Sequence, residues 1–388
     1  MQTTSSERLH IAFFGCRNAG KSSLVNAITN QQLSVVSDIK GTTTDPVKKA
    51  MELLPIGPVV IIDTAGLDDE GKLGELRIAK TLEVLGKTDI AVLVVDSTVG
   101  INEYDRELIT LFEKRKLPYV IVYNKSDLIK EKSPDLFYTN TIAGEGVNEL
   151  RELLGKIANE NKKEKYIIRD KLHAGDIVIL VIPIDESAPK GRIILPQQNV
   201  LRECLDAHAI PVCCQVEELK ETLQKITPKL IITDSQAFNK VKDIVPDNII
   251  LTSFSILMAN YRGKLNSLVK SAKVLSELQD GDNLLISEGC THHRQCNDIG
   301  TVKFPKWIAD FTKKNIKFEF TQGGEFPQDL SRYKLIIHCG GCMINEAEMT
   351  TRQNRAKEQN IPMVNYGMAI AYMNGILDRA LEIFMVEK

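Results

Sequence analysis

The sequence lacks the features that would direct a chain to a membrane, to secretion or to nucleic acid. No run of about 18 apolar residues occurs, so no transmembrane helix is predicted. The first eight residues are polar and do not resemble a signal peptide. The net charge is −2, which gives no basic field to attract nucleic acid or an anionic membrane. We therefore expect a cytoplasmic protein with neither nucleic acid nor a membrane among its partners.

Low-complexity segments and repeats of fixed period are also missing from the 388 residues. A chain of this length, with 43% hydrophobic residues, can form two or three domains with separate cores. A polar, Lys-rich stretch after Leu154 and a linking helix at Asn260–Leu278, with a turn at Asp280-Gly281-Asp282, divide the sequence. We predict three domains, at residues 1–165, 170–262 and 265–388.

Nearly continuous apolar runs are typical of strands that are buried on both faces of a parallel sheet. Four such runs occur in the first third of the chain: Leu9–Phe14, Val59–Ile62, Ile90–Asp96 and Tyr119–Tyr123. Eight later segments are also predicted to be strands: Ile177–Ile184, Ile210–Val216, Leu230–Thr233, Ile249–Phe254, Leu284–Ser287, Ile316–Thr321, Lys334–His338 and Met363–Tyr366. Helical patterns lie between them, including Gln197–Ala207, Asn260–Leu278, Val302–Lys314, Asn345–Gln359 and Ala369–Phe384. The predicted class is α/β, with a larger N-terminal domain and two smaller parallel-sheet domains.

A phosphate-binding loop follows the first predicted strand. Residues 15–22 read Gly-Cys-Arg-Asn-Ala-Gly-Lys-Ser and fit the pattern G-x-x-x-x-G-K-[ST] between a strand and a helix. In such a loop the backbone amides surround the phosphates, the lysine neutralises their charge, and the serine hydroxyl binds Mg²⁺. The residues predicted to bind the nucleotide here are Asn18, Ala19, Gly20, Lys21, Ser22 and Ser23. The first domain is therefore expected to have a P-loop GTPase or ATPase fold.

Two later motifs complete the nucleotide site and select the base. Asp63-Thr64-Ala65-Gly66 follows a buried strand, so Asp63 is expected to hold Mg²⁺ through water and the Gly66 amide to contact the γ-phosphate. Asn124-Lys125-Ser126-Asp127 follows another strand, and the Asp127 carboxylate can accept both N–H donors of guanine, which adenine does not offer. GTP is therefore the expected nucleotide.

With these motifs, residues 9–155 resemble the tRNA-modification-GTPase-like branch of the translation-factor GTPases. In that resemblance Thr43 takes the place of the Mg²⁺-binding threonine of the first switch, and Leu67 stands where Ras-like enzymes carry a catalytic glutamine. Asn18 matches the residue that helps to bind K⁺ in this branch. The resemblance implies slow, K⁺-stimulated GTP hydrolysis that depends on Lys21, Thr43, Asp63 and Gly66. The fifth GTPase element, residues 140–146, matches the usual Ser-Ala-x-x-Gly pattern only at its glycine end.

Of the eight cysteines, four follow predicted strands in polar or Gly-rich segments near the C-terminus. They are Cys290, Cys296, Cys339 and Cys342, whereas Cys16 is in the phosphate loop and Cys204, Cys213 and Cys214 are in apolar runs. If the strands before Cys290 and Cys339 are parallel, both cysteines lie at the carboxyl edge of one sheet. Three thiolates there suit either a [4Fe–4S] cluster or a Cys₃His zinc site.

The whole chain resembles the GTP-binding maturation factors of [FeFe]-hydrogenase, the HydF family. The hallmark is Cys-x-His followed at a distance by His-Cys-x-x-Cys, present here as Cys290, His292, His338, Cys339 and Cys342. The resemblance implies that the three cysteines bind a [4Fe–4S] cluster with an exchangeable fourth site. The residues themselves leave the fourth ligand open among His292, His293, His338 and Cys296, with His292 and His338 as the main candidates.

The same resemblance implies a homodimer formed by the middle domain. It also implies a scaffold and carrier that receives a diiron precursor made with two radical-SAM maturases and delivers it to apo-[FeFe]-hydrogenase. The alternatives are a zinc-stabilised regulatory GTPase and an RNA-modification GTPase. The expected cofactors are a [4Fe–4S] cluster, GTP, Mg²⁺ and K⁺.

Overall fold

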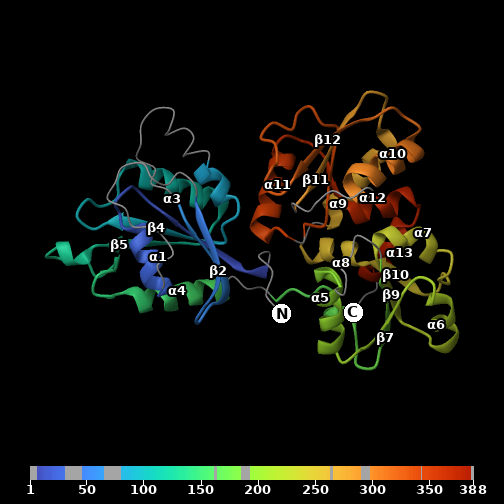
Figure 1. Cartoon of the computed structure of the whole chain (residues 1–388), viewed down its shortest axis with the longest axis horizontal. Helices are drawn as coiled ribbons and strands as arrows, with labels where there is room; N and C mark the ends of the chain where they lie inside the picture. The colour runs from blue at the N-terminus through green and yellow to red at the C-terminus, as the bar shows by residue number, and fades with distance from the viewer. Residues whose placement is uncertain are drawn as a thin grey trace. The chain divides into compact units, whose positions relative to one another are not determined.

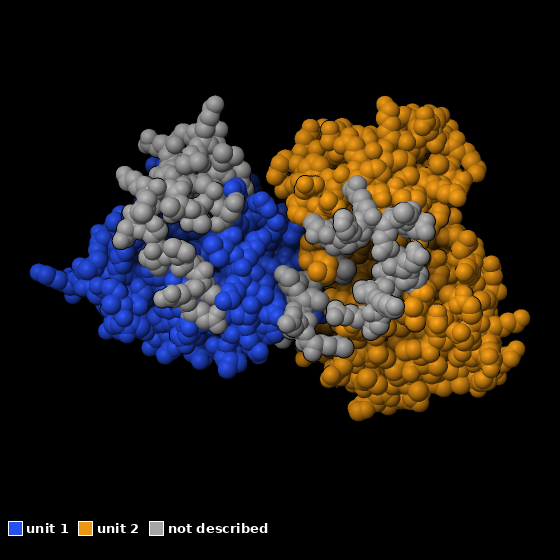
Figure 2. All heavy atoms as spheres, in the orientation of Figure 1, with its two compact units in different colours: residues 1–163, 345–351 blue, residues 164–344, 352–388 orange. Residues whose placement is uncertain are grey.

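The computed structural model describes residues 7–30, 46–64, 80–160, 164–184, 193–262, 265–289, 298–341 and 343–385. The chain forms two compact units, residues 1–163 with 345–351 and residues 164–344 with 352–388, coloured blue and orange in Figure 2. Among the helices of the described residues, none combines the length and the apolar composition needed to cross a lipid bilayer.

The first unit, in which Figure 1 labels β2, β4 and β5, contains a six-stranded sheet in the order β2-β3-β1-β4-β5-β6. Five strands are parallel: β1 (Leu9–Phe14), β3 (Gly57–Asp63), β4 (Ile90–Asp96), β5 (Tyr119–Asn124) and β6 (Phe137–Tyr138). The sheet is covered by helices α1 (Lys21–Thr29), α3 (Glu103–Arg115) and α4 (Val147–Glu160). The four strands predicted in this part of the chain are confirmed.

Strand β2 (Val47–Leu53) is antiparallel to β3 and was not predicted. Its side chains alternate poorly between apolar and polar, and Lys48, Lys49 and Ala50 are exposed. An edge strand needs little apolar surface because it is paired on one side only. Strand β1 lies near the middle of the sheet, by contrast, and Ile11 and Phe13 pack on one face while Ala12 and Phe14 pack on the other.

The second unit contains two four-stranded parallel sheets with the same topology. Their orders are β10-β9-β7-β8 and β12-β11-β13-β14. In each sheet the first and third strands lie in the middle, with the second beside the first and the fourth beside the third. The strands are β7 (Ile177–Val181), β8 (Ile210–Cys214), β9 (Leu230–Thr233), β10 (Ile250–Ser253), β11 (Asn283–Glu288), β12 (Lys317–Gln322), β13 (Leu335–His338) and β14 (Met363–Asn365). All eight were predicted to within a few residues at their ends.

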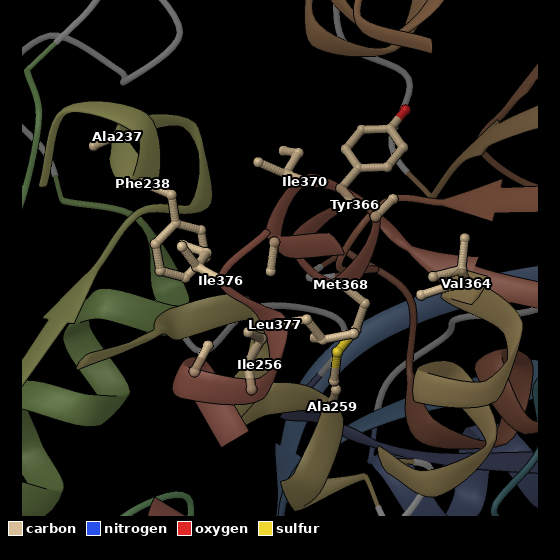
Figure 3. Close-up of a cluster of buried hydrophobic side chains, with 14 of the residues drawn as sticks. Ala237, Phe238, Ile256, Ala259, Val364, Tyr366, Met368, Ile370, Ile376 and Leu377 are labelled. Carbon is tan, nitrogen blue, oxygen red and sulfur yellow. The ribbon is translucent and has the colours of Figure 1, made fainter. Parts of the chain in front are cut away.

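Helices are exchanged between these two sheets. Helix α8 (Phe254–Tyr261) follows β10, and the next helix, α9 (Leu265–Ala272), packs beside β14 of the other sheet. Helix α12 (Tyr366–Met373) follows β14, and α13 (Leu377–Leu381) packs beside β10. One hydrophobic core therefore spans both sheets, as the side chains of Phe238, Ile256, Met368, Ile370 and Leu377 show in Figure 3. This exchange explains why the two sheets form a single compact unit.

Two of the predicted helices are wrong in their extent. The helix predicted at Asn260–Leu278 is divided, because α8 ends at Tyr261 and α9 is followed by a 3₁₀ turn at Lys273–Glu277. The helix predicted at Ala369–Phe384 is interrupted at Gly375, whose φ of 68° ends α12 before α13 begins. The remaining α-helices of the described residues are α5 (Leu195–Asp206), α6 (Leu219–Lys225), α7 (Phe238–Val241), α10 (Phe304–Thr312) and α11 (Glu346–Glu358).

Candidate functional site

The phosphate loop lies between β1 and α1. Gly15, Asn18 and Gly20 have positive φ angles, and Gly20 precedes the first residue of the helix. A Cβ atom on Gly20 would overlap the side chain of Asn124, so only glycine fits that position. The Lys21 ammonium donates to the carbonyl oxygens of Gly15, at 2.9 Å, and Cys16, at 2.7 Å. The loop thus places a cation and the N-terminus of a helix together, as phosphate binding requires.

Two predicted Mg²⁺ residues meet beside this loop. The Ser22 hydroxyl donates to Asp63 Oδ2 at 2.6 Å. The other carboxylate oxygen, Asp63 Oδ1, is buried and has no hydrogen-bond partner among the described residues. A buried carboxylate oxygen without a donor suits a cation or its bound water. The pair therefore fits Mg²⁺, while Thr43 and Gly66 lie outside the described residues.

Asn124 connects the phosphate loop to the base-reading segment. Its side chain is buried, donates to the Ala19 carbonyl at 3.1 Å and accepts from the Thr139 hydroxyl at 3.1 Å. The adjacent Lys125 donates to Asp96 Oδ2 at 2.6 Å. Burial opposes ionisation of Asp96, but the hydrogen bonds from Lys125 and Thr98 prevail and lower its pKa. This part of the site is therefore held by side chains from three strand ends.

Asp127 follows on a 3₁₀ turn at Ser126–Leu128, where its carboxylate is exposed. The degenerate fifth element forms a closed turn close in sequence to Thr139. Asn140 Oδ1 accepts from the amides of Ile142, at 3.0 Å, and Ala143, at 3.2 Å. The Asn140 side chain thus closes the turn at the position where the usual pattern has serine. This role was not predicted from the sequence. Contacts of this turn with a base stay a prediction.

Residues 339–341, here called the cysteine loop, follow β13 at the carboxyl edge of the sheet β12-β11-β13-β14. β11 and β13 are adjacent and parallel, with Ser287 opposite His338. From β11 the chain continues to β12 on one side, and β13 lies on the other side, which is the topology at which open α/β sheets bind ligands. The Cys339 sulfur accepts from the amides of Gly289, at 3.1 Å, and Gly341, at 3.3 Å. The residue before Cys290 therefore touches Cys339.

His338 is buried and both of its ring nitrogens are engaged. Arg352 Nη1 lies 3.1 Å from Nε2, and since a guanidinium only donates, Nε2 accepts. Nδ1 lies 2.8 Å from the Cys339 carbonyl, which only accepts, so Nδ1 donates. The imidazole is thus neutral, with its proton on Nδ1. Both nitrogens are thus engaged within the protein, and His338 as a fourth ligand stays a prediction.

A buried carboxylate ends β11 beside the cysteine loop. Glu288 Oε1 accepts from the Tyr366 hydroxyl at 3.2 Å, and both residues are buried. Burial, together with the nearby Glu288 charge, raises the pKa of Tyr366 well above its usual value, so the phenol stays protonated and donates. Gly300 packs so closely here that a Cβ atom would meet both side chains.

Within the described ranges, no group of three or more His, Cys, Asp or Glu side chains is arranged to share a metal ion. Of the predicted cluster residues, only His338 and Cys339 are described, while Cys290, His292 and Cys342 lie outside those ranges. The ligand set stays a prediction. Arg262 binds the loop and Arg352 binds His338, and neither arginine was predicted from the sequence. No motif marks either arginine.

Three protein-family models match the chain. The 50S ribosome-binding GTPase model matches residues 10–125, the hydrogen maturase F dimerization domain matches 167–263, and the hydrogen maturase F tetramerization domain matches 266–383. The last two together cover more than half of the 388 residues. With the loop geometry, the first match identifies the N-terminal domain as a GTPase domain.

Two curated relatives each match about two fifths of the chain. GTPase Der of Kosmotoga olearia is 33% identical over 40% of this chain and 40% of its own length. The tRNA modification GTPase MnmE of Nitrosomonas europaea is 37% identical over 39% of this chain and 35% of its own. The chain thus spans less than half the length of these relatives. The crystal structure of a probable GTP-binding protein, engB, matches 39% of this chain and 100% of its own, with 20% identity and a TM-score of 0.32.

Proposed function

Because this chain belongs to the hydrogen maturase F family, we propose that it is a GTP-hydrolysing scaffold that binds a [4Fe–4S] cluster. In this proposal it carries a diiron precursor and delivers it to apo-[FeFe]-hydrogenase. The observation that supports the cluster best is the pair of backbone amides that donate to the Cys339 sulfur at the switch point of a parallel sheet. Amide donation stabilises the negative charge of a thiolate ligand.

GTP hydrolysis would rest on the residues of the first unit. Lys21 would neutralise the phosphates, Ser22 would bind Mg²⁺, and Asp63 would hold the ion through water, consistent with the 2.6 Å contact between the last two. Thr43 and Gly66 would contact Mg²⁺ and the γ-phosphate. We also propose that Asn18, whose side chain is exposed on the loop, helps to bind a K⁺ ion that accelerates slow turnover.

Cys290, Cys339 and Cys342 would hold the cluster, and we propose His292 rather than His338 as the weak fourth ligand. The geometry of His338 supports this choice, because its two nitrogens are engaged by Arg352 and by the Cys339 carbonyl. When bound, a cluster with three thiolate ligands offers one iron position at which an exchangeable ligand or cargo can attach.

The partners are proposals as well. The two family domains are named for dimerization and tetramerization, and we propose a homodimer formed through the middle sheet. Its strand β8 lies at the sheet edge and exposes Ile210 and Cys213, so it offers a surface for a second copy. Two radical-SAM maturases and apo-hydrogenase are the proposed transient partners, and the cytoplasmic location stays a prediction.

One experiment tests both halves of this function. Protein purified without oxygen should contain iron and sulfide, absorb near 400 nm and give an EPR signal on reduction. Lys21→Ala should abolish GTP turnover and keep the cluster absorbance, whereas Cys339→Ser should keep turnover and lose most of the absorbance. A colourless protein with stoichiometric zinc would refute the cluster, and loss of both properties in either variant would refute the separation of the two sites.

A further inference from the structure

An arginine from the middle domain, the part of the second unit that precedes residue 263, binds the cysteine loop. Arg262 follows the last residue of α8, within the segment that matches the dimerization domain. Its Nη1 donates to the Gly340 carbonyl at 2.8 Å and its Nη2 donates to the Gly341 carbonyl at 3.1 Å. One planar guanidinium thus holds two successive carbonyl groups in a forked contact, which a lysine cannot reproduce.

The first of these carbonyls belongs to the same peptide group that donates to Cys339. In a trans peptide the C=O and the N–H point in opposite directions from one plane. The Gly340 carbonyl oxygen faces Arg262, so the Gly341 N–H at the other end of that plane is directed to the Cys339 sulfur, 3.3 Å away. Glycine on both sides leaves the peptide otherwise free to rotate. Arg262 therefore fixes the orientation of the N–H that reaches the sulfur.

The same contact also strengthens that hydrogen bond. A charged donor on the carbonyl oxygen polarises the peptide group and makes its N–H a better donor. Hydrogen bonds to cluster sulfurs, and positive charge nearby, favour the reduced form of a cluster and raise its reduction potential. Since an arginine stays charged at all ordinary pH values, this effect does not depend on protonation.

We propose that Arg262 is a positioning residue of the cluster site, which orients the Gly340–Gly341 peptide toward Cys339 and thereby raises the reduction potential of the bound cluster. The inference rests on the proposed cluster-binding function. It also means that the cluster site is incomplete without the middle domain, although all of the proposed ligands lie in the C-terminal domain.

The test compares three variants of the full chain. Arg262→Gln removes the charge and the fork, and Arg262→Lys keeps the charge but not the fork. Arg202→Gln is the matched control, because Arg202 is an exposed arginine in the same unit that pairs with Asp206 in α5, at 2.8 Å. Each protein is reconstituted without oxygen, its iron and sulfide are measured, and its midpoint potential is determined by redox titration followed by EPR.

We expect Arg202→Gln to match the wild type, Arg262→Gln to have a lower midpoint potential, and Arg262→Lys to have a value between the two. The iron content per chain should stay close to that of the wild type, while the midpoint potential changes. A wild-type potential in Arg262→Lys would overturn the positioning role, and this readout decides the question even if Arg262→Gln does not fold. Wild-type protein without iron and sulfide would instead refute the proposed function itself.

Discussion

Replacing Asn124 by alanine should loosen the phosphate loop from within. The Asn124 side chain is 1% exposed and joins the Ala19 carbonyl to the Thr139 hydroxyl through two hydrogen bonds of 3.1 Å. Alanine would leave both groups buried without this partner. An unsatisfied buried polar group costs about 1–3 kcal/mol, so the two together cost about 2–4 kcal/mol after partial relaxation.

This cost falls on the conformation that binds nucleotide, because Ala19 belongs to the loop. At about 1.4 kcal/mol for each factor of ten, the affinity for guanine nucleotides should drop about 30-fold to 1,000-fold. The assay is titration with a fluorescent GDP analogue at constant Mg²⁺ and K⁺, together with thermal unfolding in the absence of nucleotide. We expect both affinity and melting temperature to fall.

Thr139→Val is the informative control for this prediction. It removes only the hydroxyl that donates to Asn124 Oδ1, and leaves the bond from Asn124 to Ala19. Its effect should therefore be smaller than that of Asn124→Ala, and in the same direction. If Asn124→Ala bound nucleotide within threefold of the wild type and melted at the same temperature, the structural role assigned to this side chain would be wrong.

Three further predictions concern pH, a glycine and the sheet edge. Burial raises the pKa of Asp89 to about 6, above its unfolded value of about 3.9, so the folded state binds the extra proton and stability should fall by up to about 3 kcal/mol as pH rises from 4 to 6. Asp89→Asn keeps an acceptor for the His10 amide and should remove this dependence of stability on pH. The measurement is calorimetry, in which the unfolding transition of the first unit is recognised because GDP shifts it. Gly20→Ala should abolish binding of the fluorescent analogue, since its Cβ would overlap Asn124 at a φ of 89°. Cys213→Lys should convert a dimer to a monomer by light scattering, and an unchanged mass would exclude β8 as the interface.

Much of the fold could be predicted because parallel strands buried on both faces leave a plain record in the sequence. The apolar runs at Leu9–Phe14 and Ile90–Asp96 match β1 and β4 residue for residue. Strand β2 left no such record, since an edge strand with exposed lysines resembles a polar loop. The break at Gly375 was missed because one glycine within an apolar helical pattern is often tolerated.

The site divides in the same way. The phosphate-loop pattern sets the spacing of Lys21 and Ser22, and Asp63 ends the neighbouring strand β3, so their proximity could be predicted while their roles stay predictions. The meeting of the segments after β11 and β13 could be predicted from strand order alone, and Gly289 does contact Cys339. Arg262 could not, since it lies 78 residues from Gly340 and its contact depends on how two sheets pack.

The exchange of helices in the second unit leads to a prediction about which fragments fold. Helix α13 packs against the middle domain through hydrogen bonds. Thr252 of β10 donates to the Ala380 carbonyl at 2.8 Å, and Arg379 donates to the carbonyls of Val245 and Pro246. A fragment of residues 265–388 retains α13 but lacks the middle domain against which this helix packs. Leu377 and Leu381, now buried, would be exposed.

Exposing these two leucines costs about 3–6 kcal/mol, and the lost hydrogen bonds add to that cost. The combined loss thus approaches the whole stability of a domain at the lower end of the usual range of about 5–15 kcal/mol. Residues 265–388 should therefore lack near-ultraviolet circular dichroism and a cooperative melting transition, whereas residues 164–388 should show both. A monomeric, sharply melting 265–388 fragment would mean that the shared core is dispensable, and that the C-terminal half can hold its cysteine loop without Arg262.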